Sequence, residues 1–159
     1  MKPTTMVRLW SFQNVFLLWL VRPRIVELSA ERCVVRIPLN WITRRRDIRA
    51  MYLGTLCMGA DVAAGLIAFQ LVAEKKARIN FIFKDLRADF LKRAEGAVVF
   101  TNDDGPLIQD LVRRALESGE RHEATVHVVA TVPEKGPEPV AKFELTLSVK
   151  KLSGPGRSS

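Results

Sequence analysis

The chain has 159 residues, with 25 Lys and Arg against 17 Asp and Glu and a formal net charge of +8 at pH 7. A chain of this length forms one domain and buries a sufficient core without disulfides or structural metal. Cys33 and Cys57 lie in apolar runs without CxxC or His spacing, so we expect reduced core thiols, a cytoplasmic protein and no metal site. The positive charge favours an anionic partner, such as nucleic acid, an anionic membrane surface or a phosphate-bearing small molecule.

The first apolar segment, residues 9–21, reads LWSFQNVFLLWLV and resembles the core of an export signal. Polar residues interrupt it, and Arg22-Pro23-Arg24 stands where a cleavage site requires small residues, so we do not expect export. A short helix packed on an apolar surface explains the pattern better. We predict this packing helix within residues 1–23, followed by a single domain over 24–152 and a disordered tail at 153–159.

The next apolar segment, residues 51–69, reads MYLGTLCMGADVAAGLIAF and holds one carboxylate, Asp61. Together with its apolar flanks the run is long enough to cross a bilayer. The period-two pattern that follows it argues against a membrane span, and we expect a helix enclosed by protein instead. A buried carboxylate is costly unless it is paired, hydrogen-bonded or protonated. Asp61 is therefore either compensated by an Arg or backbone donors, or used in a function.

From Arg78 onward, apolar and polar residues alternate as in antiparallel strands. The apolar phase of the first of these strands shifts between Phe83 and Leu86, which predicts a β-bulge near Lys84-Asp85. Leu86, Ala88 and Phe90 are then expected on its apolar face. Other strands are predicted at 24–28, 32–39, 95–101, 122–132 and 140–150, and a helix is predicted at 106–118.

The order of these elements is a helix, two strands, a long apolar helix, two strands, a helix and two strands. A helix that is apolar on nearly every side must be surrounded, and a curved sheet of six antiparallel strands is long enough to wrap it. We therefore predict an α+β hot-dog fold, with the helix at 106–118 inserted between strands 4 and 5.

Two stretches carry a resemblance to a known family: RIPLNWITRRRDIRAMYLGTLCMGADVAAGLIAF and FKDLRADFLKRAEG. They resemble hot-dog thioesterases of the phenylacetic-acid-degradation type, and more closely the DUF4442 family, over about residues 24–150. Those enzymes open the central helix with an HGG motif and place Asp or Glu nine residues after its His. Here the motif positions fall on Tyr52, Leu53 and Gly54, and Asp61 stands nine residues after Tyr52. The motif His and first Gly are thus replaced, and the Asn or Gln often found just upstream is not evident.

The resemblance implies hydrolysis of an acyl thioester of coenzyme A. In such chemistry Asp61 would act as base or nucleophile, and the free N–H groups around Gly54 and Thr55 would bind the oxyanion. Gly54 and Asp61 are separated by about 10 Å along one helix, so they cannot hold one carbonyl together. A second, antiparallel helix across a two-fold axis would bring Gly54 of one protomer to Asp61 of the other. We expect a homo-oligomer, either a dimer or a dimer of dimers.

Four further residues are candidates for substrate binding. The Tyr52 hydroxyl can donate to a carbonyl in place of the His, although a Tyr at a helix start also packs without a chemical role. The basic residues Arg44, Arg45, Arg46, Lys92 and Arg93 could bind the phosphates of coenzyme A, although such clusters are also common on solvated surfaces. Of these, Arg46, Lys92 and Arg93 are the preferred candidates. Coenzyme A enters only as part of the substrate, with no separate cofactor, and the Phe-rich strands favour a hydrophobic acyl group.

Two other classes of function are compatible with the composition. The replaced His favours a non-catalytic hot-dog protein that binds acyl-CoA or a fatty acid. A nucleic-acid-binding regulator rests only on the +8 charge, without a helix-turn-helix segment or interleaved aromatic and basic residues. We therefore expect no nucleic-acid partner.

Overall fold

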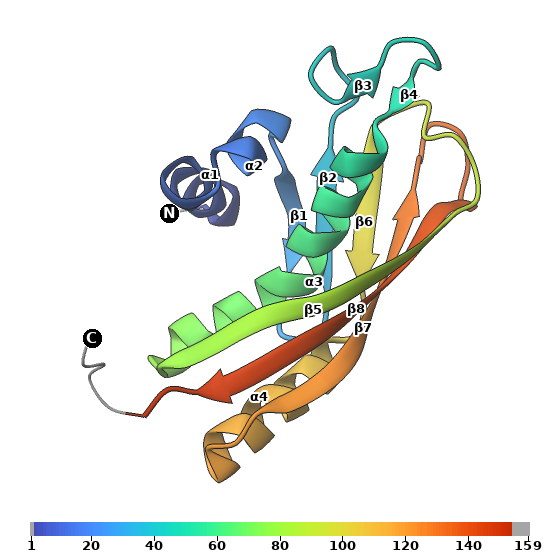
Figure 1. Ribbon diagram of the computed structural model, residues 1–159. Helices are drawn as coiled ribbons and strands as arrows, with labels where there is room; N and C mark the ends of the chain where they lie inside the picture. Colours follow the sequence, from blue (N-terminus) through green and yellow to red (C-terminus); the bar gives the residue numbers. More distant parts are fainter. Residues whose placement is uncertain (1, 154–159) are drawn as a thin grey trace.

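The computed structural model describes residues 2–153, in which a six-stranded antiparallel sheet wraps a long helix, α3 (Figure 1). The strands follow the order β1-β2-β6-β7-β8-β5 across the sheet. They are β1 (Arg24–Leu28), β2 (Cys33–Ile37), β5 (Ile79–Phe90), β6 (Val98–Asn102), β7 (His122–Thr131) and β8 (Pro139–Lys151). The helices are α1 (Pro3–Asn14), α2 (Phe16–Val21), α3 (Leu53–Lys75) and α4 (Gly105–Ser118), and a short ladder joins β3 (Arg44–Arg45) to β4 (Ala50–Met51).

This architecture confirms the predicted hot-dog fold, including the helix inserted between the fourth and fifth strands of the large sheet. The amino-terminal segment differs from the prediction, because it forms two helices separated at Val15 rather than one. The backbone of Val15 is not helical, with φ −141° and ψ 82°, so the helix cannot continue through it. The predicted disordered tail, 153–159, lies outside the described residues except for Ser153.

Strand β5 lies at the edge of the sheet and contains the predicted β-bulge. Its pairing with β8 shifts register between Phe83 and Leu86, as the apolar phase predicted. Leu86 and Phe90 were also expected on the apolar face, but they are 41% and 43% exposed. Their cross-strand partners on β8, Leu145 and Ala141, are buried, so the predicted face is confirmed. This face is incompletely covered because an edge strand has a neighbouring strand on one side only.

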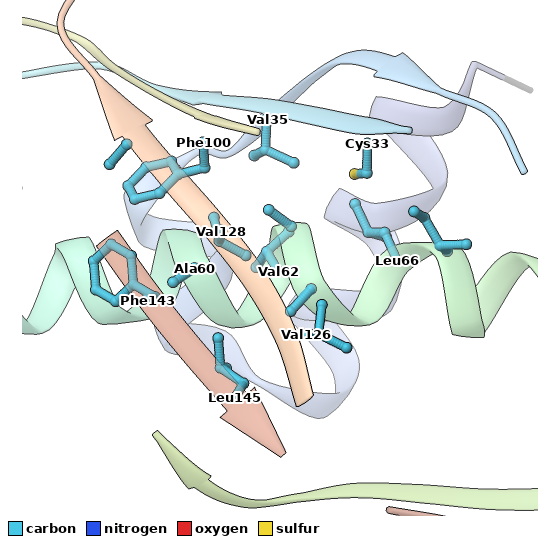
Figure 2. Packing of buried hydrophobic residues seen from close by; sticks show 14 of the residues in the cluster. Cys33, Val35, Ala60, Val62, Leu66, Phe100, Val126, Val128, Phe143 and Leu145 are labelled. Atoms are coloured by element: carbon cyan, nitrogen blue, oxygen red, sulfur yellow. The ribbon is translucent and has the colours of Figure 1, made fainter. Parts of the chain in front are cut away.

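The core lies between α3 and the sheet, with large rings from the sheet opposite small residues on the helix (Figure 2). Phe100 of β6 and Phe143 of β8 are both buried, with ring centroids 6.4 Å apart. A Cβ atom at Gly59 would lie 2.2 Å from the Phe100 ring, so helix and strand can approach this closely only with glycine at that position.

A buried side chain also ties α3 to the sheet. Asn102 at the end of β6 is fully buried, and its Nδ2 donates to the Ala63 carbonyl at 3.0 Å. Its Oδ1 accepts from the Asp104 amide at 2.8 Å, immediately before α4 begins. One amide side chain thus positions the central helix and the start of the inserted helix relative to the same strand.

Helix α3 is the one helix among residues 2–153 that is long and apolar enough to cross a membrane by length and composition. Within the fold, 61% of its apolar window is buried. A helix that is apolar all round and enclosed by a sheet is a core helix.

Candidate functional site

One stripe along α3 is left uncovered by the sheet. Asp61 is exposed on this stripe, and Gly54, Met58 and Gly65 are partly exposed. These positions are three or four residues apart, so they lie on the same side of the helix. The stripe begins at the amino-terminal turn of α3 and passes Asp61 two turns later.

The amino-terminal turn of α3 presents free backbone donors. Tyr52 precedes the helix in extended geometry, and its carbonyl accepts the first helical bond from the Leu56 amide at 3.1 Å. The N–H groups of Leu53, Gly54 and Thr55 therefore have no partner within the helix. The Tyr52 ring lies against Gly54, because a Cβ atom at Gly54 would be 2.5 Å from Tyr52 Cε1. Because Gly54 has no side chain, the Tyr52 ring can lie beside the free N–H groups of the first turn.

A pocket of about 410 Å³ lies beside this turn, and we call it the tyrosine pocket. Three predicted substrate-binding residues, Tyr52, Lys92 and Arg93, line it together. Arg46 is not among its lining residues, and Arg45 lies there instead. The other lining residues are Ile48, Ala50, Met51, Leu53, Leu56, Phe90, Leu91 and Ala94.

Two of the three cations of the tyrosine pocket are already paired. Arg45 contacts Asp47 at 2.8 Å and lowers the pKa of that carboxyl. Lys92 pairs with Glu138 and lowers the pKa of its carboxyl in the same way. Within residues 2–153, Arg93 has no ion pair or hydrogen bond. Arg93 is therefore the cation of this pocket that is free to bind an anion.

Asp61 lies in a second pocket of about 370 Å³, which we call the aspartate pocket. Its walls come from α1, α2, α3 and β5, and among residues 2–153 Asp61 is the only charged residue that lines it. The remaining lining residues are almost all apolar: Val7, Trp10, Ser11, Val15, Leu17, Leu18, Met58, Val62, Gly65, Leu66, Phe69, Phe81 and Phe83. The sequence analysis assigned the amino-terminal segment to packing alone and missed its part in this pocket. The signal was present, since residues 9–21 are apolar on more faces than one packed helix needs.

The Asp61 carboxylate differs from the enclosed group that the sequence indicated. It is exposed through the mouth of the pocket, while the apolar atoms around it partly exclude water and raise its pKa. The structure records no ion pair or hydrogen bond to it from any residue within 2–153. The compensating Arg or backbone donor that was one interpretation of Asp61 is therefore not found in this part of the chain.

Within one chain the two halves of the predicted site stay apart. Gly54 and Asp61 lie on the same stripe of α3, separated by about 10 Å along the axis. Thr55 is 4% exposed, so its side chain is buried. The structure thus brings Tyr52, Lys92 and Arg93 together at one end of the stripe and places Asp61 alone in an apolar pocket further along it.

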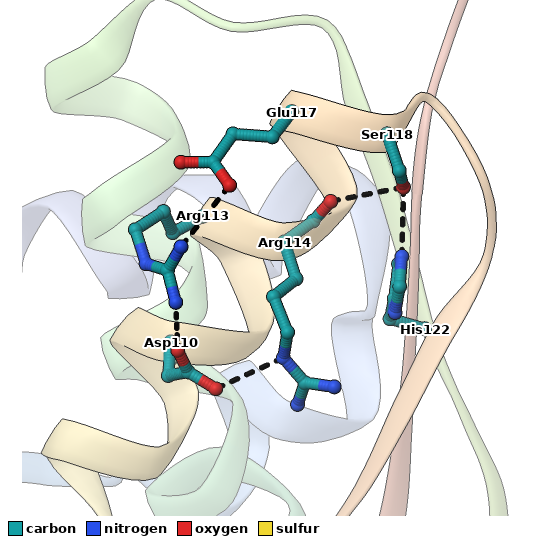
Figure 3. Close-up of polar contacts among 6 residues, drawn as sticks. All are labelled: Asp110, Arg113, Arg114, Glu117, Ser118 and His122. Atoms are coloured by element: carbon teal, nitrogen blue, oxygen red, sulfur yellow. Dashed lines mark hydrogen bonds and ion pairs between the residues drawn. The ribbon is translucent and has the colours of Figure 1, made fainter.

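A serine and a histidine that could act as nucleophile and base lie close together at the end of α4 (Figure 3). Ser118 Oγ lies 2.7 Å from His122 Nε2, but it also donates to the Arg114 carbonyl and accepts from the Glu120 amide. Neither Ser118 nor His122 lines the tyrosine or aspartate pocket. This pair joins the end of a helix to the following strand. Residues 2–153 contain no group of three His, Cys, Asp or Glu that could hold a metal ion.

Residues 10–149 match the family DUF4442, which is described as a domain of unknown function. The chain belongs to the DUF4442 family. The match covers most of the sequence, including α3, most residues of both pocket walls and the large sheet except the last two residues of β8. This confirms the resemblance seen in the sequence.

Solved structures with the same fold come from several bacteria. A thioesterase from Haemophilus influenzae is 13% identical with a TM-score of 0.70, and the match covers 97% of this chain and 94% of that one. A thioesterase family protein from Silicibacter pomeroyi is 18% identical with a TM-score of 0.67, covering 94% and 99%. A protein of unknown function from Chlorobaculum tepidum has a TM-score of 0.78 at 11% identity, covering 94% of each chain. No curated protein sequence matched the chain. At these identities the likeness establishes the fold.

Proposed function

We propose that this DUF4442 protein hydrolyses a hydrophobic acyl thioester of coenzyme A at a site shared between two protomers. The observation that carries the proposal is the Asp61 carboxylate, which lies in an apolar pocket and has no partner in the described chain. It lies on the same stripe of α3 as the free N–H groups of the first turn. Thioesterases among the structural neighbours support the same reaction class.

The chemistry assigns a separate role to each end of the stripe. Asp61 takes a proton from a water molecule, whose oxygen attacks the thioester carbonyl carbon. The oxyanion accepts hydrogen bonds from the amides of Gly54 and Thr55 of the other protomer. When the carbon–sulfur bond breaks, the thiolate leaves and takes up a proton, so the products are a carboxylic acid and free coenzyme A. A raised pKa suits Asp61 as a base, because its conjugate acid then holds the proton more firmly.

The shared site requires a dimer, and two features of the chain support one. The uncovered stripe of α3 carries Gly54, which allows a second helix to approach closely. The outer edge of β5 has no neighbouring strand within residues 2–153, and Ile82, Leu86 and Phe90 on this strand are 41–48% exposed. A second copy pairing along β5 would cover this edge and bring the two stripes together about a two-fold axis.

Two features support the proposed substrate. The aspartate pocket is lined by Phe81, Phe83 and other apolar side chains, which suits an aliphatic or aromatic acyl group. Arg93 and Lys92 in the tyrosine pocket are suited to the phosphates of coenzyme A, Arg93 because it is unpaired and Lys92 because its pairing with Glu138 is at the exposed surface.

Thiol release from a panel of acyl-CoA esters tests the proposal. Asp61→Asn should reduce turnover by about 10²- to 10⁴-fold, the usual contribution of a general base. Asp47→Asn is the matched control, because Asp47 is exposed and pairs only with Arg45. Wild-type turnover that survives Asp61→Asn would remove Asp61 from the mechanism.

Mixing variants tests the shared site. Gly54→Val blocks access to the N–H groups at the start of α3, and Asp61→Asn removes the base. Each variant alone should be inactive, while a mixed dimer contains one site in which both residues are intact and should regain turnover. No recovery in mixed dimers shown to form would place both residues in one protomer's site.

A second candidate function rests on Tyr52, which stands where related enzymes have a His. The protein would then bind acyl-CoA or a fatty acid without hydrolysis. Saturable binding of acyl-CoA without any release of thiol across the panel would favour this function over hydrolysis.

A further inference from the structure

The outer surface of α1 and α2 is apolar, which is unusual for a face turned away from a core. Seven large apolar side chains within residues 6–17 are 39–58% exposed. They are Met6, Leu9, Trp10, Phe12, Val15, Phe16 and Leu17. We call this set the N-terminal apolar face.

Helix α1 carries apolar residues on the side opposite its buried residues. Val7 and Ser11 are buried against the domain. Leu9 lies two residues from each of them, about half a helical turn, and so projects from the opposite, outer side. An ordinary surface helix carries polar residues there. The outer side of α1 thus presents an apolar surface without a covering element among the described residues.

Aromatic rings join α1 to α2 on this surface. Phe12, Phe16 and Trp19 form a cluster with ring centroids 5.2–5.7 Å apart, and Phe12 and Phe16 remain about half exposed. Trp10 packs edge-on against Phe69 of α3, which fixes α1 to the domain. The face is therefore held in place by the rest of the protein.

The charged residues of the amino-terminal segment itself, residues 2–26, all have one sign. Lys2, Arg8, Arg22 and Arg24 are exposed, and the first acidic residue of the chain is Glu27. None of these four cations has an ion pair with another residue within 2–153. The segment therefore combines exposed apolar side chains with unpaired positive charge.

We infer that α1 and α2 dock the protein onto an anionic lipid surface, lying in the interface rather than crossing it. Apolar and aromatic side chains on a rigid helix enter the boundary between headgroups and acyl chains, while Lys and Arg attract anionic headgroups. A second copy of the chain fits this face poorly, because two such faces brought together would oppose their unpaired cations. An anionic bilayer neutralises the same charges and covers the same apolar area.

The N-terminal apolar face is continuous with the aspartate pocket. Trp10, Val15 and Leu17 belong to the face and also line the pocket. Docking would therefore place the mouth of the pocket beside the lipid. The docking inference itself does not depend on thioester hydrolysis.

Co-sedimentation with lipid vesicles tests the inference, using the full chain and vesicles of phosphatidylcholine with or without phosphatidylglycerol. We expect binding to the vesicles that contain phosphatidylglycerol, weakening as salt is raised. Leu9→Gln with Phe16→Gln should lower the partition coefficient by tenfold or more, since two apolar side chains lose their burial in lipid. Leu107→Gln is the matched control, because Leu107 is 37% exposed on α4, away from α1 and α2. It should leave binding unchanged.

A charge variant tests the other half of the argument and preserves every apolar side chain. Lys2→Gln with Arg8→Gln should weaken partitioning by about fivefold for each cation removed. Failure of the wild-type chain to bind anionic vesicles at low salt would overturn the inference, as would equal binding by the Leu9 and Phe16 double variant. If that variant instead converts a larger oligomer to a smaller one in light scattering, without changing vesicle binding, the face is an interface between copies and the inference is wrong.

Discussion

Replacing Gly59 with alanine separates two opposing effects on the stability of α3. In an exposed helix interior, Gly→Ala stabilises by about 1 kcal/mol, because glycine loses more backbone entropy. Gly59 is buried, however, and a Cβ atom there would lie 2.2 Å from two atoms of the Phe100 ring and 2.7 Å from a third. Phe100 is itself fully buried, so its ring has no free space to enter.

The expected magnitude follows from these two terms. Overpacking a tight core costs about 1–3 kcal/mol, and three ring atoms inside contact distance favour the upper end. After the propensity gain is subtracted, Gly59→Ala should lower the free energy of unfolding by about 2 kcal/mol. Gly65→Ala is the matched control on the same helix, because its new Cβ would lie 3.5 Å from Phe83, an ordinary contact. It should raise the free energy of unfolding by up to about 1 kcal/mol.

Urea unfolding followed by circular dichroism, at one protein concentration, measures both variants. The two should differ by about 3 kcal/mol in opposite directions from wild type. Phe100→Leu, introduced together with Gly59→Ala, should recover part of the loss, because the smaller side chain leaves room for the new methyl group. If Gly59→Ala is as stable as Gly65→Ala, the close contact between α3 and β6 is not the reason for glycine at this position.

Other predictions follow from buried polar groups and thiols. Asn102→Ala should cost about 1–3 kcal/mol in urea unfolding, because the Asp104 amide loses its buried partner, and an unchanged midpoint would contradict this. Burial raises the pKa of the Asp61 carboxyl in the folded protein, so the folded state binds a proton more readily than the unfolded chain. The ionised carboxylate therefore lowers the free energy of unfolding, and this effect is greatest at pH values above the pKa of the folded state. Asp61→Asn should therefore raise the free energy of unfolding at pH 7, and this gain should shrink as the pH falls. Urea unfolding of both proteins across a pH series measures the gain, and a gain that does not change with pH would refute the reasoning. Burial raises the pKa of Cys33 to about 12, so a thiol reagent should label Cys57 slowly in the native protein and Cys33 only after unfolding.

Local patterns in the sequence carried enough information for most of the fold. The bulge in β5 was predictable because a side-chain period of two must change phase when one residue is inserted. The core helix was predictable because residues 53–75 are apolar on nearly every face. The break at Val15 was not, since neither Gly nor Pro marks it and the residues on both sides favour a continuous helix.

The candidate site was only partly predictable. The position of Asp61 within the helix singled it out, because a lone carboxylate in an apolar segment needs a reason. Its surroundings could not be foreseen, since the aspartate pocket is assembled from α1, α2, α3 and β5, which are distant in the sequence. The same limit applies to Arg45 and Arg46: the chain's path through the short β3–β4 ladder places Arg45, and not Arg46, on the wall of the tyrosine pocket.

The sequence by itself determined most of the helices and the strands of the large sheet, and which side of each is apolar, because periodicity is a local property of the chain. Only the tertiary structure decided which apolar sides are covered. Leu86 and Phe90 on β5 and Leu9 on α1 are apolar yet exposed, and Asp61 is exposed on the stripe of α3 that the sheet leaves uncovered. Whether an apolar side is buried depends on which elements pack against it, and this packing joins residues that are far apart in the sequence.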